Sequence, residues 1–117
     1  MKVEINVTES FKKAARPLIK KYPSFVNDLS ELEKDLIADP EIGIPLGQGA
    51  YKIRLRIKSK GKGKSGGARV ISLVYREERL VAKRKLVIVN LLTVYDKSEQ
   101  ADIRDSELRK LIETLKV

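Results

Sequence analysis

A chain of 117 residues that is 42% hydrophobic has room for a single domain, residues 1–117, with one modest core. It contains no Cys and no His, which excludes disulfides and the zinc or copper sites that need thiolate or imidazole. Binding of magnesium by carboxylates alone stays possible but would need clustered acids, and we expect no cofactor. The formal net charge of +9 is concentrated between Tyr51 and Lys97, where 14 Lys and Arg stand against three acidic residues, and this indicates a polyanion-binding site.

The beginning of the chain predicts a strand and then a helix. Val3–Val7 alternates apolar with polar residues, as a half-buried strand does. Thr8 is a suitable N-cap for a helix that extends to about Tyr22. Because Pro17 lies inside this helix and has no N–H, we expect a kink or a local break near Phe11–Lys13.

A second amphipathic helix follows and ends near Asp39. It begins either close to Pro23 or, where Ser30–Glu33 is taken as a capping box, only at Ser30. The two helices are expected to form an antiparallel hairpin. The apolar residues that mark its second member are Phe25, Leu29, Leu32, Leu36 and Ile37.

The middle of the chain changes to the period of a strand. Pro40–Ala50 is rich in Pro and Gly and predicts a loop without regular structure. A strand is expected from Tyr51 to Lys58, followed by a mobile cationic loop, Lys60–Gly67. Ala68–Tyr75 and Leu86–Tyr95 are almost continuously apolar, as central strands are.

The chain closes with a helical region for which Ser98 and Asp105 are candidate caps. The resulting order β-α-α-β-β-β-α predicts an α+β domain with its helices on one face of a mainly antiparallel sheet. No apolar run has the length of a signal peptide or a membrane span, so we expect a cytoplasmic protein without membrane contact. The residues expected to face inward near the C-terminus are Ile103, Leu108, Leu111, Ile112 and Leu115.

Cations gather on one face of the strand predicted from Tyr51 to Lys58. Alternate side chains of a strand point to the same face, about 6.6 Å apart. This face is either a solvated surface that keeps an edge strand from aggregating or a site for an anion. The residues outside Tyr51–Lys97 carry 11 Lys and Arg against 13 acids, so they do not share the excess. The cations of the strand are Lys52, Arg54, Arg56 and Lys58, and those of the following loop are Lys60, Lys62 and Lys64.

Arg69 is the residue that favours the anion site. It opens an apolar strand, where a buried guanidinium without a partner would be costly. A phosphate held between Arg69 and the Lys52/Arg54 face would satisfy it, and a salt bridge to a helix acid is the alternative. Tyr95 and Lys97 would reach the same cleft if the last strand pairs beside that of Arg69, although Tyr95 is also typical of an ordinary strand end.

A family resemblance is carried by five segments, Lys21–Ser24, Pro45–Gly49, Tyr51–Leu55, Lys60–Ile71 and Leu91–Glu99. Together they closely resemble type II toxins of the RelE/ParE superfamily, in particular the HigB-like branch, over nearly the whole chain. The resemblance implies a RelE-like microbial RNase fold. The toxins of this branch are mRNA interferases, ribosome-dependent endoribonucleases that cut messenger RNA in the ribosomal A site and so inhibit translation.

The resemblance also implies a partner and a set of catalytic residues. The partner would be a helix-turn-helix antitoxin, through which alone the toxin would be linked to DNA. Arg76 to Lys85 departs from the branch, since this connection is longer and more basic than expected, and it leaves the register of the last two strands open. The catalytic residues carried over from the family are Lys52, Arg54, Arg69, Tyr95 and Lys97.

The expected chemistry is metal-independent transesterification by the 2′-hydroxyl of the RNA. Lys52 is the candidate general base, because neighbouring cations favour the neutral form of a lysine. Arg54 and Arg69 would stabilise charge on the phosphoryl oxygens, and Tyr95 would stack on the substrate or handle a proton. Arg56, Lys58 and the loop lysines would contact phosphates. A gyrase-inhibiting toxin of the ParE branch and a non-catalytic nucleic-acid-binding module are the alternatives.

Overall fold

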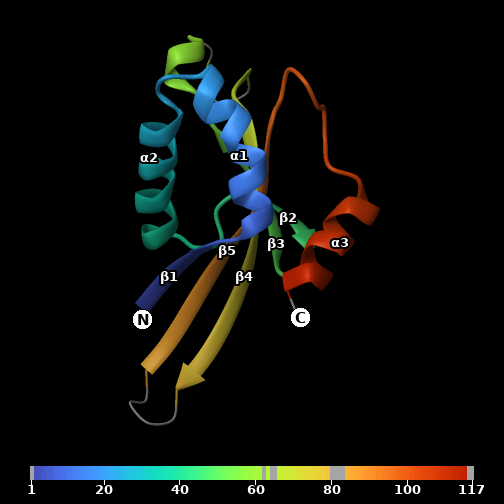
Figure 1. Cartoon of the computed structure of the whole chain (residues 1–117). Coiled ribbons are helices and arrows are strands. Elements are labelled where there is room, and N and C mark those ends of the chain that lie inside the picture. The colour runs from blue at the N-terminus through green and yellow to red at the C-terminus, as the bar shows by residue number, and fades with distance from the viewer. Residues whose placement is uncertain (1, 62, 64–65, 80–83, 116–117) are drawn as a thin grey trace.

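The computed structural model describes residues 2–61, 63, 66–79 and 84–115, whose strands form one five-stranded sheet (Figure 1). In spatial order the strands are β1 (Lys2–Val7), β5 (Arg84–Asp96), β4 (Ala68–Arg79), β3 (Ala50–Leu55) and β2 (Ile44–Gly47). β1 runs parallel to β5, and the other neighbouring strands are antiparallel. The predicted α+β class and the mainly antiparallel sheet are confirmed.

Helices cover both faces of this sheet, so the prediction of helices on one face was wrong. α1 (Glu9–Lys21) and α2 (Phe25–Ala38) lie on one side, and α3 (Asp105–Leu115) lies on the other (Figure 1). The reason is visible in the central strands, where consecutive residues such as Val70 and Ile71 are both buried. Val70 packs in the core beneath α1 and α2, whereas Ile71 packs with Leu108 and Ile112 of α3. A strand that is apolar on both faces needs cover on both.

The first two helices differ from expectation in their details. Thr8 is the N-cap of α1, and its Oγ1 accepts the Phe11 N–H at 3.2 Å. The helix runs unbroken past Pro17, whose ring is exposed to solvent, so the predicted break is absent. α2 begins at Phe25 and contains Ser30 in its interior, so the capping-box interpretation was wrong.

The segment predicted as an irregular loop contains the edge strand β2. Ile44 pairs with Lys52 of β3, and Gly47 pairs with Ala50. The two strands are joined through Gln48 and Gly49, which have φ angles of 56° and 82°. Glycine adopts such left-handed conformations without strain, so the glycines that argued against regular structure form a tight hairpin instead.

β3 is shorter than predicted and ends at Leu55. Lys58–Lys60 forms a single 3₁₀ turn, η1. The buried carboxylate of Asp28 in α2 holds this turn, because its Oδ2 accepts the Lys58 N–H at 3.2 Å and the Ser24 hydroxyl at 2.7 Å. Arg56 and Lys58, predicted as strand residues, therefore follow the strand.

The register of the last two strands is fixed by direct pairing. Arg69 lies opposite Tyr95, and the ladder continues to Arg79 opposite Arg84, with one irregularity between Ile71 and Ser72. The two strands thus extend well into the predicted connection Arg76–Lys85, and residues 80–83 lie outside the described part. Figure 1 shows the β4–β5 ribbon projecting beyond the helices.

A buried carboxylate at the end of β5 joins three elements. Asp96 accepts hydrogen bonds from the Tyr22 hydroxyl at 2.5 Å, from the Lys60 ammonium at 2.6 Å and from Ser98, whose N–H is at 2.9 Å. Burial by itself would raise the pKa of Asp96, but the bonds from Lys60, Tyr22 and Ser98 outweigh it and hold the pKa well below its usual range.

This arrangement corrects two sequence interpretations. Lys60 was predicted to contact phosphate from a mobile cationic loop, yet its side chain is only 11% exposed and is paired with Asp96. Ser98 was a candidate helix cap, yet its hydroxyl also binds Asp96, at 2.7 Å, and α3 begins seven residues later at Asp105. We therefore assign Lys60 to the stability of the fold and remove it from the phosphate-contact set.

Replacing Asp96 tests this assignment. Asp96→Asn should lower the free energy of unfolding by about 3 kcal/mol, because it leaves the Lys60 ammonium largely buried without its counter-charge. Urea denaturation followed by circular dichroism measures the change. Glu99→Gln, which breaks the exposed pair with Lys21, is the matched control and should leave stability nearly unchanged. Equal effects of the two substitutions would contradict the special role of Asp96.

Acid should remove the same contribution. A carboxylate with a lowered folded-state pKa stabilises the protein above its unfolded pKa of about 4 and loses that contribution as pH falls further. The difference in unfolding free energy between the natural chain and Asp96→Asn should therefore have its full size at pH 7 and become progressively smaller below a pH of about 4. A difference that stays constant down to pH of about 2.5 would show that Asp96 does not titrate this way.

Candidate functional site

Three central strands place four of the predicted catalytic residues on one face of the sheet. Arg54 of β3, Arg69 of β4 and Tyr95 of β5 lie directly opposite one another in register. Lys52 precedes Arg54 by two residues on β3, so its side chain points to the same face. This is the face covered by α3, as the packing of Tyr95 against that helix shows.

The pairing of Arg54 with Arg69 is unfavourable as a purely structural contact, because like charges directly opposite on a sheet repel. Arg54 is exposed, whereas Arg69 is only 6% exposed. One Arg69 nitrogen, Nη1, donates to the carbonyl of Ala68 at 3.1 Å. Two guanidinium groups side by side would gain from a bound anion, which both can contact through paired N–H donors.

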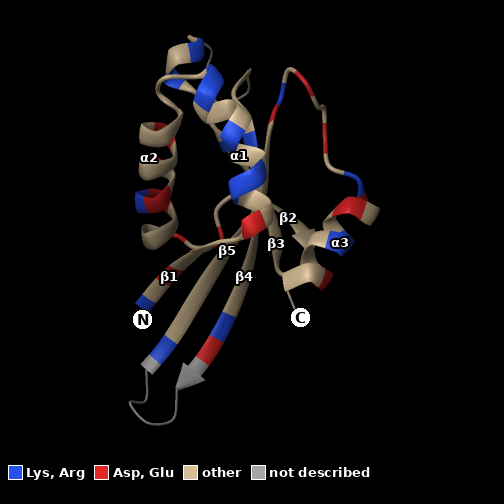
Figure 2. Cartoon of the chain, in the orientation of Figure 1, with Lys and Arg blue, Asp and Glu red and all other residues tan. Residues whose placement is uncertain are grey.

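A groove of about 950 Å³ runs along β3 and reaches Lys52, Arg54 and Arg69, which we call the row of cations. β2 is paired with β3 only as far as Lys52, so the later part of β3 borders the groove. The wall formed by α2 is acidic, as the red segments of that helix in Figure 2 show. The cations that line the groove are Lys52, Arg54, Arg56, Lys58, Arg69 and Lys97, and the acids are Asp28, Glu31 and Asp35.

These two walls restrict what the groove can hold. Asp28 is buried, while Glu31 and Asp35 are exposed along α2. An anionic chain is repelled by this wall and attracted by the side of β3 that carries Arg54 and Arg56. The face with the row of cations, rather than the depth of the groove, is therefore the better surface for a phosphate.

The remaining predicted contacts differ in their placement. Arg56 and Lys58 are exposed at the end of β3, within the groove. Lys97 also lines the groove, and its ammonium donates to the Ala101 carbonyl at 2.7 Å. Lys62 and Lys64 lie outside the described residues, so their predicted contacts with phosphate stay predictions.

Asp102 is a member of the site that the sequence did not indicate. It belongs to the connection between β5 and α3, and its Oδ1 lies 3.2 Å from the Lys52 ammonium. The Ile103 N–H, at 2.8 Å, and Lys52 lower the pKa of the Asp102 carboxyl. The candidate base thus has an anionic neighbour, whereas the sequence suggested only cationic ones. No local pattern could have revealed a contact between residues 50 positions apart.

Tyr95 is buried beneath the C-terminal segment, with 8% of its surface exposed. Burial and the nearby Asp102 raise the pKa of its hydroxyl to about 12. Asp102 is close enough for this effect, yet among the described residues the hydroxyl has no partner at hydrogen-bond distance. In this arrangement the ring is covered, so stacking on a base would require the covering segment to move.

Comparison of the chain with protein-family models, with curated proteins and with solved structures found no match. Within the described ranges, no helix is long and apolar enough to cross a lipid bilayer. The same part of the chain contains no cluster of three acidic side chains arranged to hold a metal ion.

The unpaired hydroxyl of Tyr95 gives a direct stability test. Tyr95→Phe should leave the free energy of unfolding unchanged or raise it by up to about 1 kcal/mol, because it removes a buried polar group that forms no hydrogen bond. Thermal and urea unfolding measure this. A loss of more than about 1 kcal/mol would mean that the hydroxyl has a stabilising partner in solution.

Proposed function

We propose that this chain is the toxin of a type II toxin-antitoxin system and acts as an mRNA endoribonuclease. The observation that carries the proposal is the row of Arg54, Arg69 and Tyr95 across three strands, with Lys52 beside it on the same face. Such a cluster is costly for a fold to maintain and is suited to one phosphodiester. The family resemblance of the sequence and the α+β fold support the finer assignment to the RelE-like microbial RNase fold.

The proposed reaction is cleavage of RNA by its own 2′-hydroxyl. The 2′-oxygen forms a bond to the adjacent phosphorus as the bond from phosphorus to the 5′-oxygen breaks, which leaves a 2′,3′-cyclic phosphate and a 5′-hydroxyl. Once Asp102 has moved away, Lys52 loses its extra proton to solvent and, as the neutral amine, accepts the proton of the 2′-hydroxyl. The departing 5′-oxygen takes a proton from water. Arg54 and Arg69 stabilise the negative charge that develops on the phosphoryl oxygens.

The other predicted residues have supporting roles in this proposal. Lys97 lines the groove beside the row and adds positive charge near the leaving oxygen. Tyr95 contacts substrate only when the segment over it is displaced, because its ring is buried. Lysine, arginine and tyrosine are weak general acids and bases, which suits an enzyme that relies on another molecule to orient its substrate. We propose that the A site of the ribosome has this role.

The protein partners remain proposals of the same kind. We propose that a helix-turn-helix antitoxin binds the chain in the cytoplasm and links it indirectly to DNA. The net charge of +9 suits a partner with an acidic surface. An acidic antitoxin that covers Arg54 and Arg56 would block access of RNA to the site.

Substitution of Arg54 tests the nuclease proposal. Arg54→Ala should reduce RNA cleavage at least about 100-fold, the usual loss for one donor to a charged transition state. Because Arg54 is exposed, the fold should be retained. The measurements are growth after induction, the mapping of new 5′-hydroxyl ends within translated codons, and circular dichroism of the purified chain.

Lys13→Ala is the matched control, since it removes one positive charge from the exposed surface of α1 on the opposite side of the sheet. It should cut RNA as the natural chain does. If cells that express the chain show breaks in their DNA while their messenger RNA stays intact, the chain is a gyrase-inhibiting toxin and not a nuclease. Binding of RNA without new ends would identify a non-catalytic module.

A further inference from the structure

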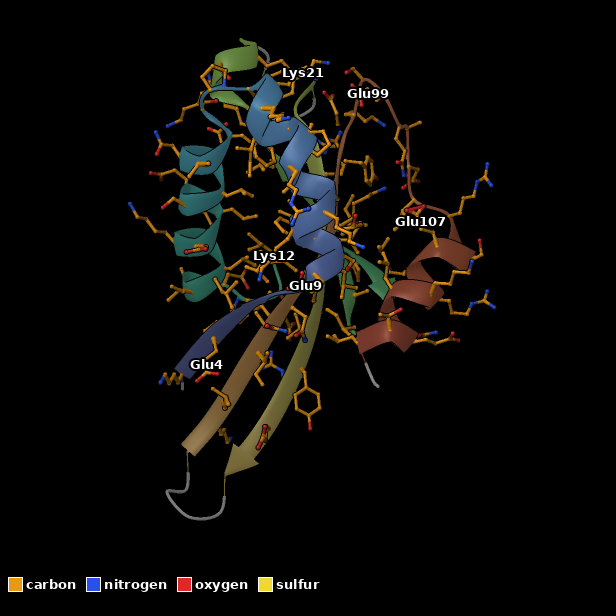
Figure 3. All side chains as sticks on the ribbon, in the orientation of Figure 1. Glu4, Glu9, Lys12, Lys21, Glu99 and Glu107 are labelled. Atoms are coloured by element: carbon orange, nitrogen blue, oxygen red, sulfur yellow. The ribbon has the colours of Figure 1, made fainter. Side chains whose placement is uncertain are left out.

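The connection between β5 and α3, residues 97–104, forms a strap across the site and is anchored near its beginning. The Lys97 N–H donates to the Gly67 carbonyl at 3.1 Å. Glu99 pairs with Lys21 of α1 at 3.3 Å, and Figure 3 shows these two side chains at the same end of the molecule. Two acidic residues, Glu99 and Asp102, lie between the basic residues at its two ends, Lys97 and Arg104 (Figure 2).

The strap reaches the site through Asp102, which forms a salt bridge with Lys52. Asp102 places Oδ1 3.2 Å from the Lys52 ammonium, and Lys97 adds a further favourable charge. The Asp102 side chain is 61% exposed, whereas that of Lys52 is 21% exposed. The carboxylate therefore reaches inward from the solvent side onto a lysine that is largely covered.

A carboxylate oxygen and a phosphate oxygen make the same demands on their neighbours, since both accept charge-assisted hydrogen bonds from ammonium and backbone N–H groups. We propose that the Asp102 carboxylate occupies the subsite of a substrate phosphate and that RNA must displace it to reach Lys52. This inference rests on the proposed function and adds to it the position of the phosphate and an internal competitor for it.

The contacts of the strap make such displacement feasible. The Lys52–Asp102 pair is exposed on one side, and exposed pairs contribute little because water and salt screen them. The anchors at Lys97 and Glu99 lie before Asp102, and Ile103 packs only partly against the α3 core. Inside the strap, the Lys97 ammonium donates to the Ala101 carbonyl at 2.7 Å and the Gln100 amide donates to the Asp102 carbonyl at 2.9 Å, but both bonds are exposed. The Asp102 side chain can therefore turn away from Lys52 while both ends of the strap stay in place.

Asp102→Asn tests the proposal in the full-length chain. Asparagine keeps an oxygen that can accept the Ile103 N–H but lacks the charge that holds Lys52. Calorimetric titration with a 2′-O-methylated single-stranded RNA, which cannot be cleaved, and separately with inorganic phosphate gives the affinities. We expect the variant to bind the RNA about fivefold more tightly, the gain available when one exposed ion pair no longer competes.

Two controls separate this effect from a general change in charge. Glu113→Gln, an equal charge change on the exposed surface of α3, should leave the affinity almost unaltered. In a Lys52→Ala background, Asp102→Asn should bring no gain, because the two residues act on each other. A gain that matches that of Glu113→Gln, or one that persists without Lys52, would overturn the proposal.

The remaining outcomes distinguish this inference from the proposed function. A gain seen with inorganic phosphate but not with RNA would overturn the assignment of the subsite to a nucleic acid strand. Tighter RNA binding by Asp102→Asn, together with an absence of cleavage by the natural chain, would keep the subsite and reject the nuclease. Cleavage by the natural chain, with an affinity that Asp102→Asn leaves unchanged, would keep the nuclease and reject the internal competitor.

Discussion

The buried Asp96 carboxylate is the interaction on which the arrangement of this protein depends. It brings together Tyr22 at the end of α1, Lys60 of η1 and Ser98 at the start of the strap. A buried charge is tolerated only when its partners are all in place, so these three elements must close around it together. Asp96 follows Tyr95 on β5, so the two side chains point to opposite faces of the sheet. The bonds of Asp96 on the α1 face therefore hold the start of the strap, which then crosses to the α3 face.

On the opposite face of the sheet, the register of β3, β4 and β5 places their cations close together. Arg54 and Arg69 face each other, and the energy lost by their repulsion has to be recovered elsewhere. Within the chain, Asp102 supplies part of it by pairing with Lys52. The acidic wall of α2 is directed to the groove instead, so positive and negative surfaces meet along the edge of β3. The site is thus a balance of charges that an outside anion can shift.

The strand residues of this site could be predicted from the periodicity of the sequence, whereas the residues that the loops contribute could not. Alternation along β3 is enough to predict that Lys52 and Arg54 share a face, and one hairpin is enough to bring Arg69 opposite. The roles of Lys60 and Asp102 could not be predicted, because both depend on contacts between loops, which have no repeating pattern. The placement of α3 was also missed, although the doubly apolar strand at Val70 and Ile71 already required cover on two faces.

The parallel pairing of β1 with β5 has a consequence for how the chain acquires its structure. The first strand of the sequence reaches its neighbour only in the last third, since Val7 lies opposite Leu91. Contacts so distant in sequence form slowly, because a long loop must close before they contribute. During synthesis, β1 and its apolar residues Val3 and Ile5 therefore stay unpaired until β5 has left the ribosome, and the sheet is completed only then.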